Sequence, residues 1–276
     1  MRYRGRRTAE RLSANPRYSE WSPKASITWR ILPTLSVYGS YARGFRLPTL
    51  DEASPLFGDI PDLDAQVSDA GEIGAKYRGD RFEAALALYY MMVEDEILFD
   101  PFRFTNENLD RVRHRGVEAS FDVQLLEWLY AYANYTFDDV KIVDADDPRV
   151  EGARMPITPK HRGTLGIFAQ LPYDLEIGAN GNIVGERTRA NDFDRQVTDL
   201  DLYGTLDLLL AWRPSFGEHV SGALTLALRN VTNEKYEDFG SRDDFNPDTF
   251  ALEPTAFFFP AATFTWEVGL MFTVRR

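Results

Sequence analysis

The chain has 276 residues, of which 44% are hydrophobic and 27% charged, and its formal net charge is −12. That mixture is too apolar for a disordered chain and too charged for a bundle of membrane helices. The longest uncharged stretches, residues 31–42 and 254–266, are shorter than the about 20 apolar residues that a spanning helix needs. The excess of 43 acidic over 31 basic residues argues against nucleic acid as a partner, and the lack of cysteine excludes disulfides and thiolate chemistry.

Alternation of apolar and polar residues is the dominant pattern, and it is typical of β-strands, whose successive side chains point to opposite faces. In residues 81–92 every even position is apolar, and one apolar face recurs in residues 116–125 and 264–273. The pattern predicts twelve strands, at residues 1–8, 20–30, 35–43, 68–78, 81–93, 110–125, 129–138, 161–171, 175–187, 202–213, 221–231 and 262–274. Many are near the about 9 to 11 residues with which a tilted strand crosses a bilayer, rather than the about 5 to 6 of soluble sheets.

The connections alternate between short and long. Short links are expected at residues 31–34, 79–80, 126–128 and 172–174, and long ones near 44–67, 94–109, 139–160, 188–201 and 232–261. The pair Gly79-Asp80 predicts a tight hairpin with the glycine at positive φ. Short periplasmic turns and long outer loops are typical of outer-membrane barrels. We therefore expect an all-β fold, a transmembrane antiparallel β-barrel segment of about twelve strands, in a single domain over residues 1–276.

The face opposite the apolar one carries charges and amides. Exposing a cation to lipid at the bilayer midplane costs about 2 to 4 kcal/mol, and exposing a carboxylate costs less. We expect these residues to line the lumen, where solvation and mutual pairing would be their ordinary role. They are Glu72, Lys76, Glu83, Glu118, Asp122, Asn134, Asp207, Arg229 and Glu267. Aromatic residues towards the predicted strand ends fit interfacial girdles, although each alone would also fit a soluble core.

Six ordered segments carry a resemblance to a known family: WSPK at 21–24, YARGFRLPTLDE at 41–52, RGVE at 115–118, PITPKH at 156–161, GER at 185–187 and NVTNEKY at 230–236. Their order and spacing resemble the C-terminal barrel half of TonB-dependent outer-membrane receptors over nearly the whole chain. No single segment would suffice, because glycine-arginine pairs and asparagine-rich turns are common.

The resemblance implies the last half of a 22-stranded barrel in the outer membrane of a Gram-negative bacterium, surrounded by outer-membrane lipid. It also implies a plug domain, the TonB energy-transducing system and a small-molecule ligand such as a metal chelate, here a ferric siderophore or a cobalamin-like compound. Haem ranks lower, because the family's haem receptors usually carry a histidine in the loop that corresponds to residues 49–69, and this chain has none there. The family's signal peptide, plug and first strands have no counterpart, so we expect a truncated reading frame or a fragment.

Catalysis and metal binding find little support. His114, His161 and His219 are far apart, and none has a partner at the spacing of a local metal or hydrolase motif. The acidic clusters lack the spaced oxygen ligands of a calcium loop. We expect no enzyme activity, no catalytic residue, no cofactor and no metal site.

Ligand contact is expected from residues in the outer loops, although packing of the loops against one another would explain the same aromatics. The candidates are Arg46, Phe99, Phe102, Phe104, Phe245 and Phe250.

Two other functions compete with the receptor. A small closed barrel could be an outer-membrane phospholipase or protease, and an all-β sandwich could be a soluble carbohydrate-binding protein.

A sheet in lipid cannot leave its edges unpaired, because each unsatisfied backbone group costs several kcal/mol. The first strand must then pair with the last, or other strands must be supplied.

Overall fold

The computed structural model describes residues 20–53, 62–100, 105–145, 150–217, 219–244, 246–247 and 249–274. Within these residues the regular structure is entirely β. The strands are β1 (Lys24–Leu32), β2 (Leu35–Arg46), β3 (Gln66–Arg78), β4 (Phe82–Asp100), β5 (Thr105–Leu126), β6 (Leu129–Asp144), β7 (His161–Leu171), β8 (Leu175–Val184), β9 (Tyr203–Trp212), β10 (Val220–Arg229), β11 (Glu237–Asp243), β12 (Thr255–Pro260) and β13 (Thr265–Val274). No helix in this part of the chain is long and apolar enough to cross a membrane.

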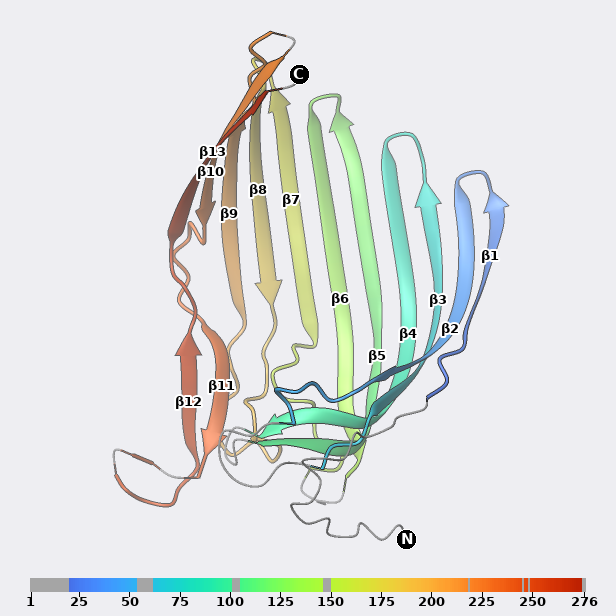
Figure 1. Cartoon of the computed structure of the whole chain (residues 1–276), viewed down its shortest axis with the longest axis vertical. Coiled ribbons are helices and arrows are strands. Elements are labelled where there is room, and N and C mark those ends of the chain that lie inside the picture. The colour runs from blue at the N-terminus through green and yellow to red at the C-terminus, as the bar shows by residue number, and fades with distance from the viewer. Residues whose placement is uncertain are drawn as a thin grey trace.

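Eleven of the strands form one antiparallel sheet, in which β1 to β10 follow one another and β13 pairs with β10. The sheet is open, with β1 and β13 at opposite edges, and it is curved (Figure 1). Short turns lie at one end of the strands and long connections at the other, as predicted. The hairpin β11–β12 forms a separate two-stranded sheet beyond the long-connection end. The prediction of an antiparallel all-β segment of about twelve strands is confirmed, and the segment does not close on itself.

Most of the predicted strands correspond to strands of the large sheet, one is not tested, and two predicted loops differ. The first predicted strand, residues 1–8, lies outside the described residues. The long loop predicted near residues 94–109 is wrong, because β4 and β5 continue to Asp100 and from Thr105. The predicted loop at 232–261 contains β11 and β12. The sequence pattern did not predict β12, because apolar and polar residues do not alternate in the run Phe257-Phe258-Phe259.

The cross-strand registers gather the apolar residues on one continuous face, hereafter the apolar face. Leu88 on β4 lies opposite Ile73 on β3 and Val117 on β5. At the other side of the sheet, Leu226 lies opposite Leu210 and Val268. Side chains of this face remain exposed, as large aliphatic and aromatic residues on β1, β4, β7, β10 and β13 show. The alternative of a soluble sandwich fails here, because a second sheet would have to cover this face.

Within the described residues, the opposite face, hereafter the polar face, is covered at the long-connection end. There Leu109, Val112, Val140 and Ile142 form a small buried cluster. Leu98 of β4 packs against it together with four residues of the connections, Ala145, Val150, Met155 and Phe193. Parts of the β6–β7 and β8–β9 connections therefore fold over the polar face at this end.

The β3–β4 turn is a hairpin as predicted, but its glycine does not have the expected positive φ. The amide of Gly79 donates to the carbonyl of Phe82 at 2.9 Å. A Cβ at Gly79 would come within 2.9 Å of the Tyr77 ring. The glycine is thus explained by close approach of an aromatic ring and not by backbone freedom.

Candidate functional site

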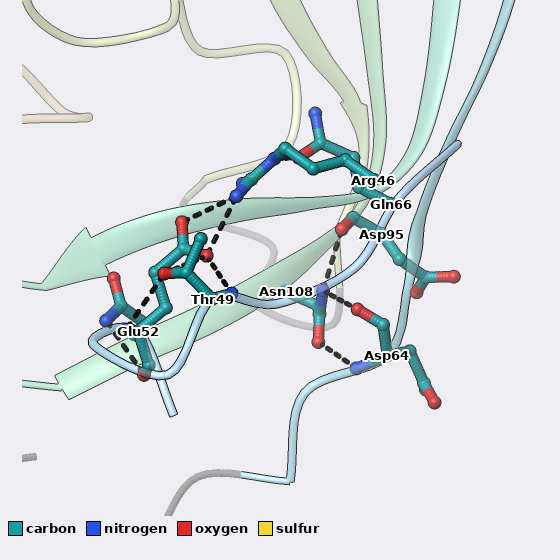
Figure 2. Close-up of polar contacts among 8 residues, drawn as sticks. Arg46, Thr49, Glu52, Asp64, Gln66, Asp95 and Asn108 are labelled. Carbon is teal, nitrogen blue, oxygen red and sulfur yellow. Dashed lines mark hydrogen bonds and ion pairs between the residues drawn. The ribbon is translucent and has the colours of Figure 1, made fainter. Parts of the chain in front are cut away.

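The connection that leaves β2 is organised by one carboxylate, as Figure 2 shows. Glu52 accepts hydrogen bonds from the amide and hydroxyl of Thr49 at 2.8 and 3.0 Å, a Thr-x-x-Glu pattern that tightens the turn. Arg46 Nη1 lies 2.8 Å from both carboxylate oxygens of Glu52, and its Nε donates to Gln66 Oε1 at 3.1 Å. Partial burial raises the pKa of Glu52, but the hydrogen bonds from Thr49 and Arg46 outweigh it and leave the pKa below its usual value.

Two asparagines of β5 tie this connection to the sheet. Asn106 donates to the carbonyl of Glu52 at 3.0 Å. Asn108 accepts from the amide of Asp64 at 2.8 Å and donates to the carbonyl of Asp95 at 2.7 Å (Figure 2). Because Phe99 lies opposite Asn106 in the β4–β5 register, the structure brings Phe99 into the neighbourhood of the Arg46–Glu52 pair.

The outer ends of β4 and β5 bend away from the rest of their strands and run across the long-connection end of the sheet (Figure 1). Within the bend Asp95 has a φ of 55°, a left-handed conformation that costs most residues about 1 to 2 kcal/mol and aspartate less. The hydrogen bond from Asn108 to the Asp95 carbonyl holds it in place. Phe99, near the end of β4, thereby belongs to the part of the hairpin that runs across this end of the sheet.

A second organised region joins the β8–β9 connection to the β11–β12 hairpin. Arg189, with a side chain only 5% exposed, donates to the carbonyls of Thr198 and Phe257 at 2.8 and 3.0 Å and to Glu237 Oε2 at 2.6 Å. Arg187 donates to the carbonyls of Asp238 and Glu237 at 2.8 and 2.7 Å. Two arginines therefore fasten the hairpin through its backbone.

The same connection buries a carboxylate completely. Asp192 accepts from the amides of Gln196 and Val197 at 2.7 and 3.2 Å, and Arg242 Nη1 of β11 lies 3.6 Å away. Arg242 also binds Asp194 at 2.5 Å.

Close to the start of β9, the rings of Tyr203 and Tyr236 stack with centroids 3.8 Å apart.

The segment NVTN at 230–233 forms the turn that ends β10. Asn230 has a φ of 50°, and its side chain accepts from the amide of Glu234 at 2.9 Å and donates to that residue's carbonyl at 2.9 Å. Its own amide donates to Asp207 Oδ1 at 2.8 Å. Asn233 Oδ1 accepts from the amide of Phe264 at 3.2 Å, just before β13. The motif thus turns the chain from β10 into the connection that carries β11 and β12. Through Asn233 it also contacts the end of that connection, just before β13.

The nine residues expected to line the lumen all lie on the polar face, as the cross-strand registers place them. Most have partners there. Glu72 accepts from the Tyr38 hydroxyl at 2.5 Å, Lys76 lies 5.1 Å from the centroid of the same ring, and Asp122 accepts from Tyr130. Glu83, Asn134, Asp207 and Arg229 also have polar partners, respectively Arg78, Thr164, the Asn230 amide and Glu267. Lining of a lumen stays a prediction, because the sheet is open.

Of the remaining candidates for ligand contact, the structure describes Phe250. Phe250 is exposed in the turn before β12, with a φ of 55°. Phe102, Phe104 and Phe245 lie outside the described residues. Among the described residues, no group of three or more histidine, aspartate or glutamate side chains is arranged to hold a metal ion.

Sequence reasoning missed the cluster of Arg187, Arg189, Asp192 and Arg242. The GER motif at 185–187 marked its beginning, but the partners come from residues some 50 positions later, and no local pattern points to them.

Comparison with known proteins identifies the fold. Residues 2–233 match the model of the TonB dependent receptor-like β-barrel family. An uncharacterized TonB-dependent receptor of Haemophilus influenzae is 26% identical over 216 residues, which cover 75% of this chain and 61% of that protein. An iron-regulated outer membrane virulence protein of Vibrio cholerae is 23% identical over 193 residues, 61% of this chain and 29% of that protein.

Solved structures agree. The ferric yersiniabactin uptake receptor FyuA of Yersinia pestis superposes with a TM-score of 0.67 at 19% identity, covering 91% of this chain and 36% of that one. This likeness concerns the fold alone. The chain spans 61% and 29% of the length of the two relatives named above. With most of its length matched by the family model, the chain belongs to the TonB-dependent receptors, in their β-barrel domain.

Proposed function

We propose that the chain forms part of the wall and the outer loops of an outer-membrane receptor for the active uptake of a scarce ligand, such as a ferric siderophore or a cobalamin-like compound. One observation carries this proposal: eleven strands separate an exposed apolar face from a face of charges and amides. Lipid of a Gram-negative outer membrane is the environment that suits such a sheet, because hydrocarbon covers the apolar face and water or protein the other.

The polar face supports a plug domain and a TonB energy-transducing system as partners. Charged side chains on it pair with one another only in part, so an internal domain with complementary polar groups would fit against them. The names of the relatives support uptake rather than catalysis, since they describe receptors and an iron-regulated outer-membrane protein.

Ligand contact would be made where the bent β4–β5 hairpin lies over the polar face. Phe99 is 47% exposed there and offers a ring to an apolar or aromatic chelator. Arg46 has its Nη1 and Nε engaged within the connection, so it would act chiefly by fixing the loop. Phe250, together with Phe102, Phe104 and Phe245, would complete the surface.

Direct binding tests the proposal. The chain, solubilised from outer membranes in detergent, is titrated with a panel of ferric siderophores and with cobalamin, and binding is followed by tryptophan fluorescence. We expect one class of ligand to bind, and Phe99→Ala to weaken that binding about tenfold through loss of an aromatic contact. Phe82→Ala, on the apolar face near a short turn, is the matched control and should change nothing.

The function is tested separately in cells. A strain that lacks its own receptor for the bound ligand should grow on it as sole iron or cobalamin source only when it carries the complete receptor and an active TonB system. Growth that is independent of either, or absence of binding by every member of the panel, would contradict the proposal.

A further inference from the structure

A histidine and a glutamate meet across the bend of β4 and β5. His114 Nε2 of β5 lies 3.1 Å from Glu96 Oε2 of β4, and the two side chains are only 17% and 14% exposed. In the register of the hairpin, however, Glu96 lies opposite Leu109, five residues away from His114. The contacts around Glu52 in Figure 2 use neither side chain.

Only a bent hairpin can make this contact. Five residues of extended strand span about 16 Å, which is more than a glutamate and a histidine side chain can bridge together. Beyond Asp95 the hairpin turns across the end of the sheet, and the gap closes (Figure 1). The register of β4 and β5 is the same on both sides of Asp95, so the ladder of the hairpin does not itself set the angle of the bend.

Apolar contacts fill the same angle but have no preferred direction. Leu98, two residues beyond Glu96, packs against the buried cluster that contains Leu109 and Val112. Burial of these side chains favours a compact bend, yet the hydrophobic effect is non-directional and leaves the angle free. A hydrogen-bonded pair of charged groups adds a fixed geometry, because its strength depends on the donor–acceptor distance and angle.

The titratable groups that face His114 come from four strands. They are Glu96 and Tyr89 of β4, Glu118 of β5, Asp138 of β6 and Arg162 of β7. The connections that pack nearby contribute the uncharged side chains of Met155 and Phe193 to the adjoining cluster. Among these residue types, histidine is the one that changes its charge between pH 5 and 8. A change of pH within this range therefore acts on the bend through His114.

We propose that Glu96 and His114 are positioning residues for ligand contact: their pair sets the angle of the β4–β5 bend, and with it the place of Phe99, most firmly when the imidazole is protonated. A protonated imidazole donates a charge-assisted bond, about twice as strong as a neutral one. The hold is therefore strongest at mildly acidic pH and weakens as the pH rises through the range in which histidines lose their proton. The role of Phe99 rests on the proposed function, whereas the bend depends on no ligand.

Hydrogen exchange of the detergent-solubilised full chain tests the pair without ligand. After correction for the intrinsic effect of pH, the amides of residues 96–100 should exchange about fivefold faster at pH 8 than at pH 6. His114→Gln and Glu96→Gln should each abolish this difference and exchange about tenfold faster than the unchanged chain at pH 6. His161→Gln is the matched control, because His161 contacts Tyr135 on the apolar face, away from the bend, and it should keep the pH difference.

Spin labels measure the bend directly, since the chain has no cysteine and two can be introduced at chosen sites. Labels at Thr105→Cys and Ser120→Cys lie on β5 on either side of the bend, and a straight strand would separate them by about 50 Å. At pH 6 we expect one shorter, narrowly distributed distance, and a broader distribution in Glu96→Gln. The exchanged pair Glu96→His with His114→Glu should restore the narrow distribution, which a general loss of stability could not do.

Two results would overturn the proposal: the same pH profile of exchange in His114→Gln and the unchanged chain, or the same distance distribution in Glu96→Gln and the unchanged chain. Either variant suffices if the other fails to fold. Where a ferric siderophore or cobalamin binds, its affinity should follow the same pH profile. Equal affinity at pH 6 and pH 8, with a bend that responds, would reject the positioning role and leave uptake standing. If no member of the panel binds, the exchange and distance results still decide what sets the bend.

Discussion

Arg189 of the β8–β9 connection and Glu237 of β11, 48 residues apart in the sequence, form an ion pair of 2.6 Å. The arginine is buried and also donates to the carbonyls of Thr198 and Phe257, whereas the glutamate stays partly exposed. These bonds attach the β11–β12 hairpin, which is not part of the large sheet, to the β8–β9 connection.

Removing this arginine should release the hairpin. Arg189→Ala leaves two carbonyls and a carboxylate without their donor, so the local free energy of opening of β11–β12 should fall by about 2 to 4 kcal/mol. Hydrogen exchange of the β11 and β12 amides measures it. Arg195→Ala is the matched control, because Arg195 is exposed in its pair with Asp199 and should contribute at most about 1 kcal/mol. Unchanged exchange in Arg189→Ala would show that the hairpin is held by other contacts.

The anchorage of the connection after β2 should depend on pH. Because the pKa of Glu52 is lower in the folded chain than its usual value of 4.5, its stabilising effect is complete above that value. The effect is lost as the pH falls through the lowered pKa, where the protonated carboxyl no longer pairs with Arg46. Exchange of the amides of residues 47–53 should therefore accelerate at acidic pH relative to Glu52→Gln at the same pH. Identical pH profiles in the two proteins would refute this role of the carboxylate.

Lipid contact on one face predicts opposite results for neighbouring residues. Leu165, 64% exposed in the middle of β7, lies on the apolar face, and Thr164 lies on the polar face opposite Asn134 and Asn182. Leu165→Arg should lower the free energy of unfolding in lipid vesicles by about 2 to 4 kcal/mol, whereas Thr164→Arg should change it little. Urea titration of the vesicle-inserted chain measures both. Equal losses would mean that β7 is not oriented in lipid as proposed.

The turn after β10 should require asparagine. Asn230→Ala loses the side-chain bonds to Glu234 and places alanine at a φ of 50°, for a combined cost of about 2 to 3 kcal/mol. Asn230→Gly loses the same bonds but adopts that φ freely, so it should be about 1 kcal/mol more stable than the alanine variant. Urea titration ranks the two. The reverse order would show that the backbone conformation contributes nothing.

Alternation of side chains was enough to predict the large sheet, because along most of its length each strand has one apolar and one polar face, and the two alternate in the sequence. Where strands leave that setting, the prediction was wrong. The acidic run Glu94-Asp95-Glu96 looks like a loop, yet it is the bend at which β4 leaves the wall. The site follows the same rule. Arg46 and Glu52 are close in sequence and their motif was noticed, whereas Asn106 joins them only through the register of β5.

The separation of the two faces has a consequence for handling the protein. A mean hydropathy of −0.35 and an isoelectric point of about 4.8 would ordinarily describe a readily soluble acidic chain. That average combines an apolar face with a charged face, and only the charged face is well solvated by water. An amphiphile will have to coat one side of the sheet, and the edges that β1 and β13 form in the described part of the chain call for strands to pair with them.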